Sequence, residues 1–210
     1  MTELDELPAF APQPVVLEGQ HVRLEPLGPQ HIDELLDAGA DREVFRWMPT
    51  VDFTSRASAA AWLDAAVAEG EAGRAVAFAT CALQPDGTAR AVGSTRFFDF
   101  IPPNRGLEIG WTWIGRPWQR TALNTEAKRL MLGHAFEAWG ALRVQLKTDS
   151  RNAKSRAAME RIGCGFEGVL RNHVLLPDGS MRHSAFYSVI AEEWPAVRER
   201  LDGFLGRSGA

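Results

Sequence analysis

The sequence predicts an α+β fold, with helices flanking a mixed, mostly antiparallel central sheet in a single domain. The apolar patterns predict strands and helices in the order β-α-α-β-β-β-α-β-α-β-β-α. Antiparallel hairpins flank a βαβα segment in this order, which is typical of the α+β class. The 210 residues contain no internal repeat, low-complexity tract or linker, so one domain is expected.

The chain is expected to begin with a strand and two helices. Residues 20–25 alternate between apolar and polar side chains, as a strand does. After a Gly-Pro pair, Ile32, Leu35 and Leu36 recur at helical spacing. Thr54 and Ser55 are suitable N-cap residues for an alanine-rich helix that ends near residue 70.

Three strands follow. Residues 74–83 and 91–99 are rich in β-forming side chains, and the Pro-Asp-Gly sequence between them predicts a tight turn. They therefore form an antiparallel hairpin. Residues 107–114 form the next strand.

The rest of the chain alternates between helices and strands. The strongest helix prediction is residues 124–139, where apolar side chains form one stripe that Gly140 closes. The remaining predicted elements are a strand at 142–148, a helix at 152–162, a hairpin of strands 166–176 and 182–190 around a second Pro-Asp-Gly turn, and a last helix at 192–205.

Composition excludes several classes of protein. Hydrophobic residues make up 45% and charged residues 24%, which argues against a disordered or fibrous chain. The net charge of −4 provides no positive field for nucleic acid or an anionic membrane. Two cysteines lack the spacing of a disulfide framework or a zinc site, so no metal is expected. The acidic N-terminus and the lack of a long apolar run predict a cytoplasmic protein.

The domain is expected to span residues 17–205. The proline-rich and acidic residues 1–16 suit an arm on the surface, and residues 206–210 form a tail.

The chemistry is expected around the strand at 107–113. Alternation places Leu107, Ile109, Trp111 and Trp113 on its core face and Glu108 on the other. A loop over residues 116–124 leads directly into the next helix, whose first turn carries Thr125 and Glu126 and whose free N–H groups and positive dipole end suit a phosphate. The alternative is an ordinary connection, because the loop lacks the glycines of a nucleotide-binding fingerprint.

Four segments resemble the GCN5-related N-acetyltransferases, the GNAT superfamily, and in particular the RimJ/RimL-type branch that acetylates ribosomal-protein N-termini. They are LEIGW at 107–111, WQRTALNTEAK at 118–128, NAKS at 152–155 and GF at 165–166, in this order. The resemblance spans roughly residues 17–200. It implies a GNAT-like sheet and acetyl-CoA as co-substrate.

The family binds the coenzyme A pyrophosphate with a Gln/Arg-x-x-Gly-x-Gly/Ala loop. Here Gln119, Ala122 and Asn124 occupy that frame, so the loop must use helical or extended backbone at Ala122, and Asn124 is available to cap the helix. The cofactor-binding residues that the resemblance implies are Trp113, Ile114, Gln119, Arg120, Thr121, Ala122, Asn124, Thr125, Asn152 and Ser155.

The resemblance also implies the catalytic residues. Glu108 corresponds to the carboxylate that takes a proton from the amine; the alternative is a cross-strand partner for a basic residue such as Arg96. Ser155 corresponds to a donor to the departing sulfur and Asn152 to a ligand of the pantetheine amide, although Asn152 also suits an N-cap. The predicted substrate-binding residues are Phe45, Trp47, Glu108 and Trp111.

The resulting hypothesis is an N-acetyltransferase that moves an acetyl group directly from acetyl-CoA to a primary amine, on a protein N-terminus or a small molecule. One alternative is a non-catalytic module that binds coenzyme A or a partner. The other is transfer of another acyl group such as succinyl, for which Arg96 and Arg120 are available. Exposed aromatic residues and the C-terminal hairpin offer surface for a homodimer.

Overall fold

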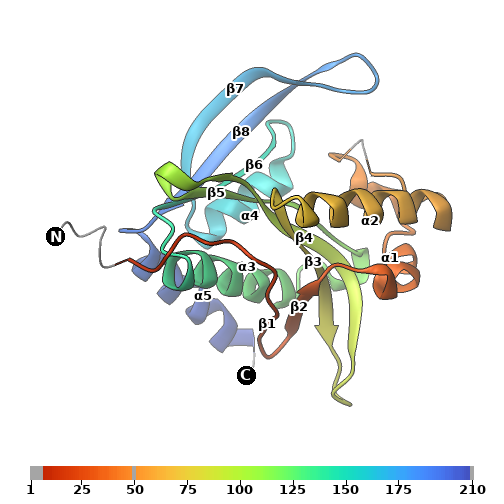
Figure 1. Cartoon of the computed structure of the whole chain (residues 1–210), viewed down its shortest axis with the longest axis horizontal. Coiled ribbons are helices and arrows are strands. Elements are labelled where there is room, and N and C mark those ends of the chain that lie inside the picture. Colours follow the sequence, from red (N-terminus) through yellow and green to blue (C-terminus); the bar gives the residue numbers. More distant parts are fainter. Residues whose placement is uncertain (1–6, 49–50, 209–210) are drawn as a thin grey trace.

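One eight-stranded sheet forms the centre of the computed structural model, which describes residues 7–48 and 51–208 (Figure 1). Its strand order is β1-β2-β3-β4-β5-β6-β8-β7, and only β5 and β6 are parallel neighbours. The strands are β1 (Leu17–Glu18), β2 (Val22–Pro26), β3 (Ala75–Leu83), β4 (Ala89–Ile101), β5 (Gly106–Ile114), β6 (Arg143–Asp149), β7 (Gly165–Leu175) and β8 (Met181–Ile190).

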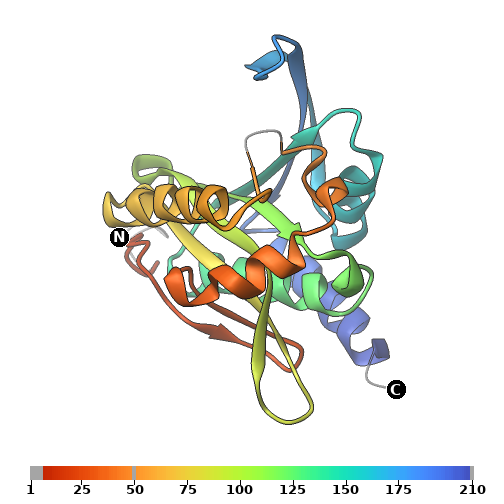
Figure 2. The same ribbon diagram turned by 90° about the vertical axis from the view of Figure 1, so that its right-hand side faces the viewer.

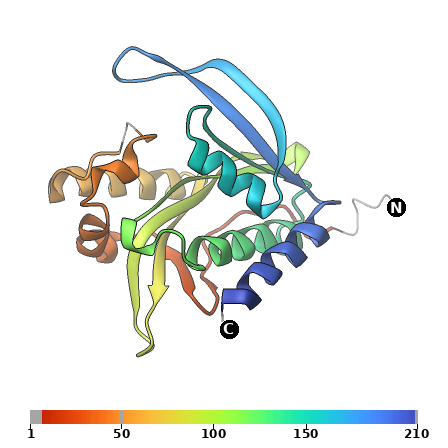
Figure 3. The ribbon, with the colours of Figure 1, turned by 180° about the vertical axis from the view of Figure 1, so that it is seen from behind.

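Helices cover both faces of this sheet, which confirms the predicted α+β class. Helices α3 and α5 lie side by side on one face with α4 next to α5 (Figure 3), and α1 contacts α2 on the other face (Figure 2). The helices are α1 (Ile32–Ala38), α2 (Arg56–Glu71), α3 (Leu123–Gly133), α4 (Ala153–Ile162) and α5 (Trp194–Ser208). Short helical turns are η2 (Pro29–His31), η3 (Arg42–Phe45), η4 (Pro102–Asn104), η5 (Arg116–Trp118) and the π-helical η6 (His134–Ala138).

Each face of the sheet has its own buried apolar cluster. On the side of α3 and α5 the cluster includes Phe97, Ile109 and Met131. On the side of α1 and α2 it includes Leu63 and Trp113. The sheet is therefore buried between two layers, except where the β7–β8 hairpin extends beyond the rest of the molecule (Figure 1).

The predicted strands and helices are all present, with small differences. The helix predicted at 124–139 is α3 followed by the π-helical η6, and the two-residue strand β1 was not predicted. Residues 7–16 contain no helix or strand. Part of this segment packs against the core through Phe10 and Val15, and the Arg105 guanidinium donates to the Pro8 carbonyl.

The predicted alternation along β5 is wrong at Trp111. The register of β5 against β4 shifts between Gly110 and Trp113, and Trp111 has a φ of 51°. This bulge turns the Trp111 side chain away from the α3 face, and its ring lies 37% exposed. It also puts Trp113 in the cluster beneath α1 and α2 instead of the one beside Ile109. A positive φ in a bulky residue is uncommon and typical of functional sites.

A buried carboxylate holds the first strands against α3. The Glu126 side chain, which is 6% exposed, accepts hydrogen bonds from the backbone N–H groups of Gln20 (2.8 Å), His21 (2.6 Å) and Val22 (2.9 Å). A Cβ added to Gly19 would lie 2.3 Å from this carboxylate, so only glycine fits there. Glu126 thus connects α3 to the turn between β1 and β2.

Replacing Glu126 by alanine is expected to lower the free energy of unfolding by about 3 kcal/mol, because three partly or fully buried N–H groups lose their acceptor. Urea denaturation followed by circular dichroism measures this. Glu137→Ala, which removes a half-exposed carboxylate at the other end of the same helical segment, is the control. Equal loss in both variants would contradict the role given to Glu126.

Candidate active site

The sheet splits between its two parallel strands. Gly106 to Glu108 of β5 pair with Arg143 to Gln145 of β6. Beyond this point, residues 109–114 stay with β4 and residues 146–149 stay with β8, and within the described chain these two stretches do not pair with each other. The backbone groups that face the split can therefore bind an extended ligand containing amides.

The N-terminus of α3 lies at the end of β5 and offers free N–H groups. The helix begins at Leu123, after an N-cap Ala122 with a φ of −62°. Among the described residues, no acceptor bonds the N–H groups of Ala122, Asn124 and Thr125, whereas Leu123 donates to Thr121 Oγ1 (3.3 Å). The expected helical backbone at Ala122 is confirmed. The expectation that Asn124 caps the helix is wrong, because it lies inside the first turn.

The loop before α3 is braced by Gln119. Its Nε2 donates to the Ile114 carbonyl (2.8 Å), and its Oε1 accepts from Lys154 Nζ at the start of α4. The positive φ of this loop falls at Arg120 (63°), instead of at the positions where the family has glycine. The loop therefore bridges the split and leaves the Arg120 side chain exposed.

The N-terminus of α4 lies beside the loop and holds two predicted residues. Asn152 is the N-cap: its Oδ1 accepts from the N–H of Ser155 (3.1 Å), and its Nδ2 donates to Thr148 Oγ1 (3.1 Å). The Ser155 hydroxyl has no hydrogen-bond partner in the described part of the chain. Arg161 of α4 donates to Thr125 Oγ1 (2.6 Å), so the side chain of Thr125 joins α4 to α3.

Glu108 lies at the point where the strands separate. It is 1% exposed, and its Oε2 accepts from Lys147 Nζ (2.6 Å) and Gln145 Nε2 (2.8 Å). Its Oε1 has no hydrogen-bond partner among the described residues. The alternative role, a cross-strand ion pair with a basic residue, is present with Lys147 of β6, and no ion pair joins Glu108 to Arg96 among the described residues.

Burial raises the pKa of Glu108, while the charge of Lys147 and the hydrogen bonds from Lys147 and Gln145 oppose this rise. The net direction is upward. A glutamate with a raised pKa is a better proton acceptor than a surface glutamate, which suits a general base.

The predicted acceptor residues have different environments. Phe45 is packed in the core, with its ring 4.9 Å from that of Trp113. Its other side borders a cavity of about 170 Å³, lined by Arg42, Phe45, Arg46, Met48, Val51 and Phe53. Trp47 lies under the Arg151 guanidinium (5.4 Å), between η3 and the start of α4. Trp111 faces Arg96 (4.6 Å). The side chain of Trp113 is buried, so only its backbone is available to a ligand.

Sequence reasoning missed Lys147 and Gln145. Alternation within 143–149 places both on the same face of β6, but the parallel neighbour of that strand cannot be derived from a single sequence. Their contact with Glu108 appears only once β5 and β6 are paired.

A second buried charge lies behind the bulge. Lys128 of α3 is 5% exposed, and its Nζ donates to Thr112 Oγ1 (3.0 Å) and Thr95 Oγ1 (3.4 Å). No carboxylate pairs with it in the described structure. Burial lowers the pKa of Lys128 from 10.5 to about 8.

Lys128→Met is expected to stabilise the protein at pH 7 by about 1–2 kcal/mol, because removing an unpaired buried charge outweighs two lost hydrogen bonds. The pKa of Lys128 is lower in the folded protein than in the unfolded chain, so between pH 8 and pH 10.5 the unfolded chain binds more protons at this amine than the folded protein does. The free energy of unfolding of the wild type therefore rises with pH through that range. The difference between the two proteins should therefore shrink from pH 8 to pH 10.5. Urea denaturation at pH 7 and pH 10 checks this, and a constant difference would contradict it.

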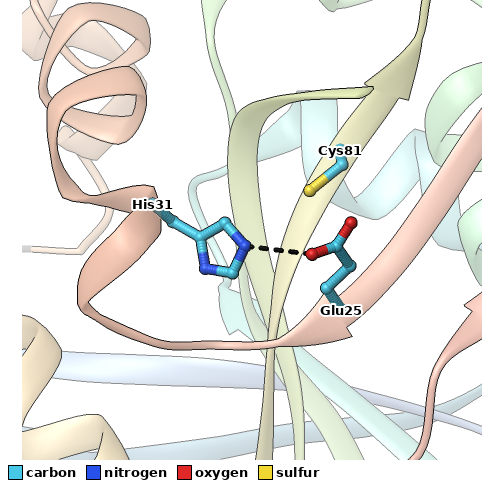
Figure 4. A group of neighbouring side chains, drawn as sticks. All are labelled: Glu25, His31 and Cys81. Carbon is cyan, nitrogen blue, oxygen red and sulfur yellow. Dashed lines mark hydrogen bonds and ion pairs between the residues drawn. The ribbon is translucent and has the colours of Figure 1, made fainter. Parts of the chain in front are cut away.

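Glu25, His31 and Cys81 form a cluster with metal-ligand chemistry beside α1, on the face of the sheet that α1 and α2 cover (Figure 4). His31 Nδ1 accepts from the Gly28 N–H (3.2 Å), so Nε2 carries the proton that it shares with Glu25 (3.3 Å). A metal on Nε2 would need the proton on Nδ1 instead. Burial, with the nearby charges of Glu25 and Glu34, raises the pKa of Cys81 to about 12, which further disfavours a thiolate ligand. The cluster is explained by its hydrogen bonds, and the absence of a metal from the chemistry stays a prediction.

In the described part of the chain, no helix is both long and apolar enough to cross a membrane.

The split sheet, the helix N-terminus at its open end and the buried carboxylate at its apex define the class of acyl-CoA-dependent acetyltransferases. Comparison with known families agrees: the model of the acetyltransferase (GNAT) domain matches residues 21–165. The chain belongs to the GNAT acetyltransferase family.

Individual relatives support this assignment. A GCN5-related N-acetyltransferase from Brucella melitensis is 31% identical, with a TM-score of 0.85 over 96% of this chain and 90% of that one. RimJ of Mycobacterium smegmatis, crystallised with CoA-disulfide, shares the fold at 22% identity (TM-score 0.74; 94% and 96% covered). A putative ribosomal N-acetyltransferase, YdaF of Bacillus subtilis, is 35% identical over 91 residues; these are 43% of this chain and about half (49%) of that protein.

Proposed function

We propose that this protein transfers the acetyl group of acetyl-CoA directly to a primary amine, on a protein N-terminus or a small molecule. The observation that carries the proposal is the split between β5 and β6 with Glu108 at its apex. The Bacillus subtilis relative, a putative ribosomal N-acetyltransferase, favours a protein N-terminus among the acceptors. We place the reaction in the cytoplasm, and a homodimer is compatible with it.

The residues present fit coenzyme A. Its pyrophosphate oxygens would accept hydrogen bonds from the backbone N–H groups of Ala122, Asn124 and Thr125, which have no acceptor among the described residues. The positive end of the dipole of α3 favours an anion at this place. Its pantetheine amides would pair with backbone groups along the split, including those of Trp113 and Ile114. The Mycobacterium smegmatis relative was crystallised with CoA-disulfide, which supports coenzyme A as the ligand. When bound, acetyl-CoA supplies an acetyl group activated as a thioester.

Glu108 is proposed as the general base. Its unpartnered Oε1 accepts a proton from the acceptor's ammonium group, and the free amine nitrogen then bonds to the thioester carbon. As the carbon–sulfur bond breaks, the electron pair goes to sulfur. Ser155, whose hydroxyl makes no hydrogen bond in the described structure, is proposed to donate a proton to that sulfur, with the Asn152 cap fixing the position of Ser155. The second proton leaves the nitrogen as the amide forms and replaces the proton that Ser155 has given up, and Glu108 then releases its proton to water.

Steady-state assays of acetyl-CoA with a panel of peptide and small-molecule amines test this function. Mass spectrometry of the acceptor and thiol titration of released coenzyme A should give equal amounts of acetylated amine and free thiol. Binding of coenzyme A without transfer to any amine would favour the non-catalytic module instead. Absence of coenzyme A binding would overturn the cofactor assignment.

A further inference from the structure

A buried arginine on β4, the strand next to that of Glu108, has no ion pair with an acid among the described residues. Arg96 of β4 is 6% exposed, and its Nε is buried with no hydrogen-bond partner in the described structure. Burial lowers the pKa of Arg96 to about 10, so the guanidinium remains charged at neutral pH. The acid whose charge acts on Arg96 is Glu69, and Glu69 already accepts two hydrogen bonds from Arg74 (2.9 and 2.7 Å). A buried charge of this kind is costly unless something pairs with it.

Two tryptophan rings hold the Arg96 guanidinium. Trp111 of β5 lies 4.6 Å from it and Trp62 of α2 lies 5.8 Å from it. Aromatic rings stabilise a cation through its faces and leave its N–H edges unbonded. Those edges form a fork that matches a carboxylate. The bulge at Trp111 turns its ring toward Arg96, so the uncommon backbone there produces one of the two ring contacts of the guanidinium.

The position of Arg96 relates it to the reacting groups. It lies opposite Gly110 in the β4–β5 ladder, and Phe98, two residues along, lies opposite Glu108. Arg96 and Glu108 therefore share one face of the sheet, one residue pair apart. Trp111, which covers Arg96, is 37% exposed, so the site has a side that is open to solvent.

Three other cations lie on this face. Lys147 bonds Glu108 and lies near Asp99 (3.5 Å), and Arg151 bonds Asp149 (2.8 Å). Arg182 of β8 donates to Ser184 Oγ (3.1 Å) and is acted on by the charges of Asp149 and Glu108. Among these four cations, Arg96 is the one whose guanidinium makes no hydrogen bond within the described residues.

We propose that Arg96 binds a carboxylate of one of the two substrates, so that the enzyme selects a carboxylate-bearing acceptor amine or a carboxylate-bearing acyl group. This inference rests on the proposed acyl transfer at Glu108. A carboxylate at the N–H edges of the guanidinium would be its missing partner, while the two tryptophan rings contact the guanidinium itself. The acceptor amine and the acyl group would each place a carboxylate at Arg96. They differ only in which of the two substrates carries that carboxylate.

The test compares matched substrates in the wild type, Arg96→Gln and the control Arg56→Gln, whose arginine is exposed and bonded to Asp33. The acceptor arm pairs amino acids with their amides, and peptides that have Glu at the second position with peptides that have Gln. The acyl arm compares succinyl-CoA with acetyl-CoA on neutral amines. We expect at least a 10-fold preference for the carboxylate in one arm, measured as the ratio of kcat/KM for the two matched substrates within each protein. This ratio should be retained in Arg56→Gln and fall to about one in Arg96→Gln.

Several results would overturn the proposal. If the wild type turns over substrates without a preference for the carboxylate in either arm, the transferase function stands and the role of Arg96 is excluded. A preference for the carboxylate that Arg96→Gln retains would exclude that role as well. If no amine were acetylated, the proposed function would fail separately. Equilibrium binding would then decide. One measurement compares the affinities of succinyl-CoA and acetyl-CoA, and the other compares N-acetyl amino acids with their amides in the presence of coenzyme A. Equal affinities in both comparisons would overturn the proposal, and a preference for the carboxylate that is lost in Arg96→Gln would support it. If Arg96→Gln does not fold, Arg96→Lys replaces it, because lysine keeps the charge and loses the fork.

Discussion

Replacing Glu108 by glutamine is expected to lower kcat/KM for acetyl transfer by about 100- to 10,000-fold, the usual contribution of a general base. Glutamine has nearly the same shape and can keep a hydrogen bond to Lys147, but it cannot take a proton from an ammonium group. Coenzyme A binding should stay within about threefold of the wild type, because the N-terminus of α3 is unchanged. Stopped-time assays of acetylated amine and calorimetric binding of coenzyme A measure the two quantities.

The pH profile gives this prediction its sharpest form. Burial raises the pKa of Glu108, so the wild-type kcat/KM should rise with pH and reach its half-maximum above the ordinary range of a glutamate. Lys147→Met removes the charge that lowers this pKa, so its acidic limb should move to higher pH. A Lys147 that only supported the fold would change the stability without moving this limb.

Two controls separate chemistry from folding. Glu167→Gln makes the same substitution in another ion-paired glutamate of the sheet, bonded to Arg143 (2.7 Å), and should leave kcat/KM nearly unchanged. Melting temperatures identify any unfolded variant. Because Glu108→Gln alone leaves the charge of Lys147 without an ion-pair partner, the double variant Glu108→Gln and Lys147→Met removes both charges together. A folded Glu108→Gln protein with wild-type turnover would exclude Glu108 as the base.

The fold could be predicted because its signals are local. The Pro-Asp-Gly turns, the apolar stripe of α3 and the Ser55 cap of α2 each act within a few residues, so the elements and the α+β class followed from the sequence. The isolated Gly110 indicates a bulge in this strand, and the register confirms one between Gly110 and Trp113. Its effect on the side chains could not be predicted, because Trp111 and Trp113 continue the apolar alternation of Leu107 and Ile109 in the sequence.

The candidate site was predicted less completely for a related reason. Glu108, the loop before α3 and the start of α4 are continuous segments whose motifs can be recognised in order. The bonds of Lys147 and Gln145 to Glu108 depend on the parallel pairing of strands about 40 residues apart, which no local signal specifies. The isolation of Arg96 likewise depends on which acids are absent around it, and this is a property of the packed structure.

Ala122→Asp is expected to change folding stability and coenzyme A affinity in opposite directions. Ala122 is the N-cap of α3 and provides no side-chain acceptor, whereas aspartate is among the best N-caps and should stabilise the protein by about 1 kcal/mol. The same carboxylate would occupy the free N–H groups and repel the pyrophosphate. Coenzyme A affinity should fall about 100-fold, or about 2.8 kcal/mol.

Ala122→Ser separates the two effects, because serine caps the helix without charge. It should gain similar stability and lose at most about 10-fold in coenzyme A affinity. Calorimetry at low and high salt gives a further distinction: the repulsion in Ala122→Asp should weaken as salt screens it, whereas a steric block would not. If Ala122→Asp becomes more stable and binds coenzyme A as tightly as the wild type, the pyrophosphate does not bind at the N-terminus of α3.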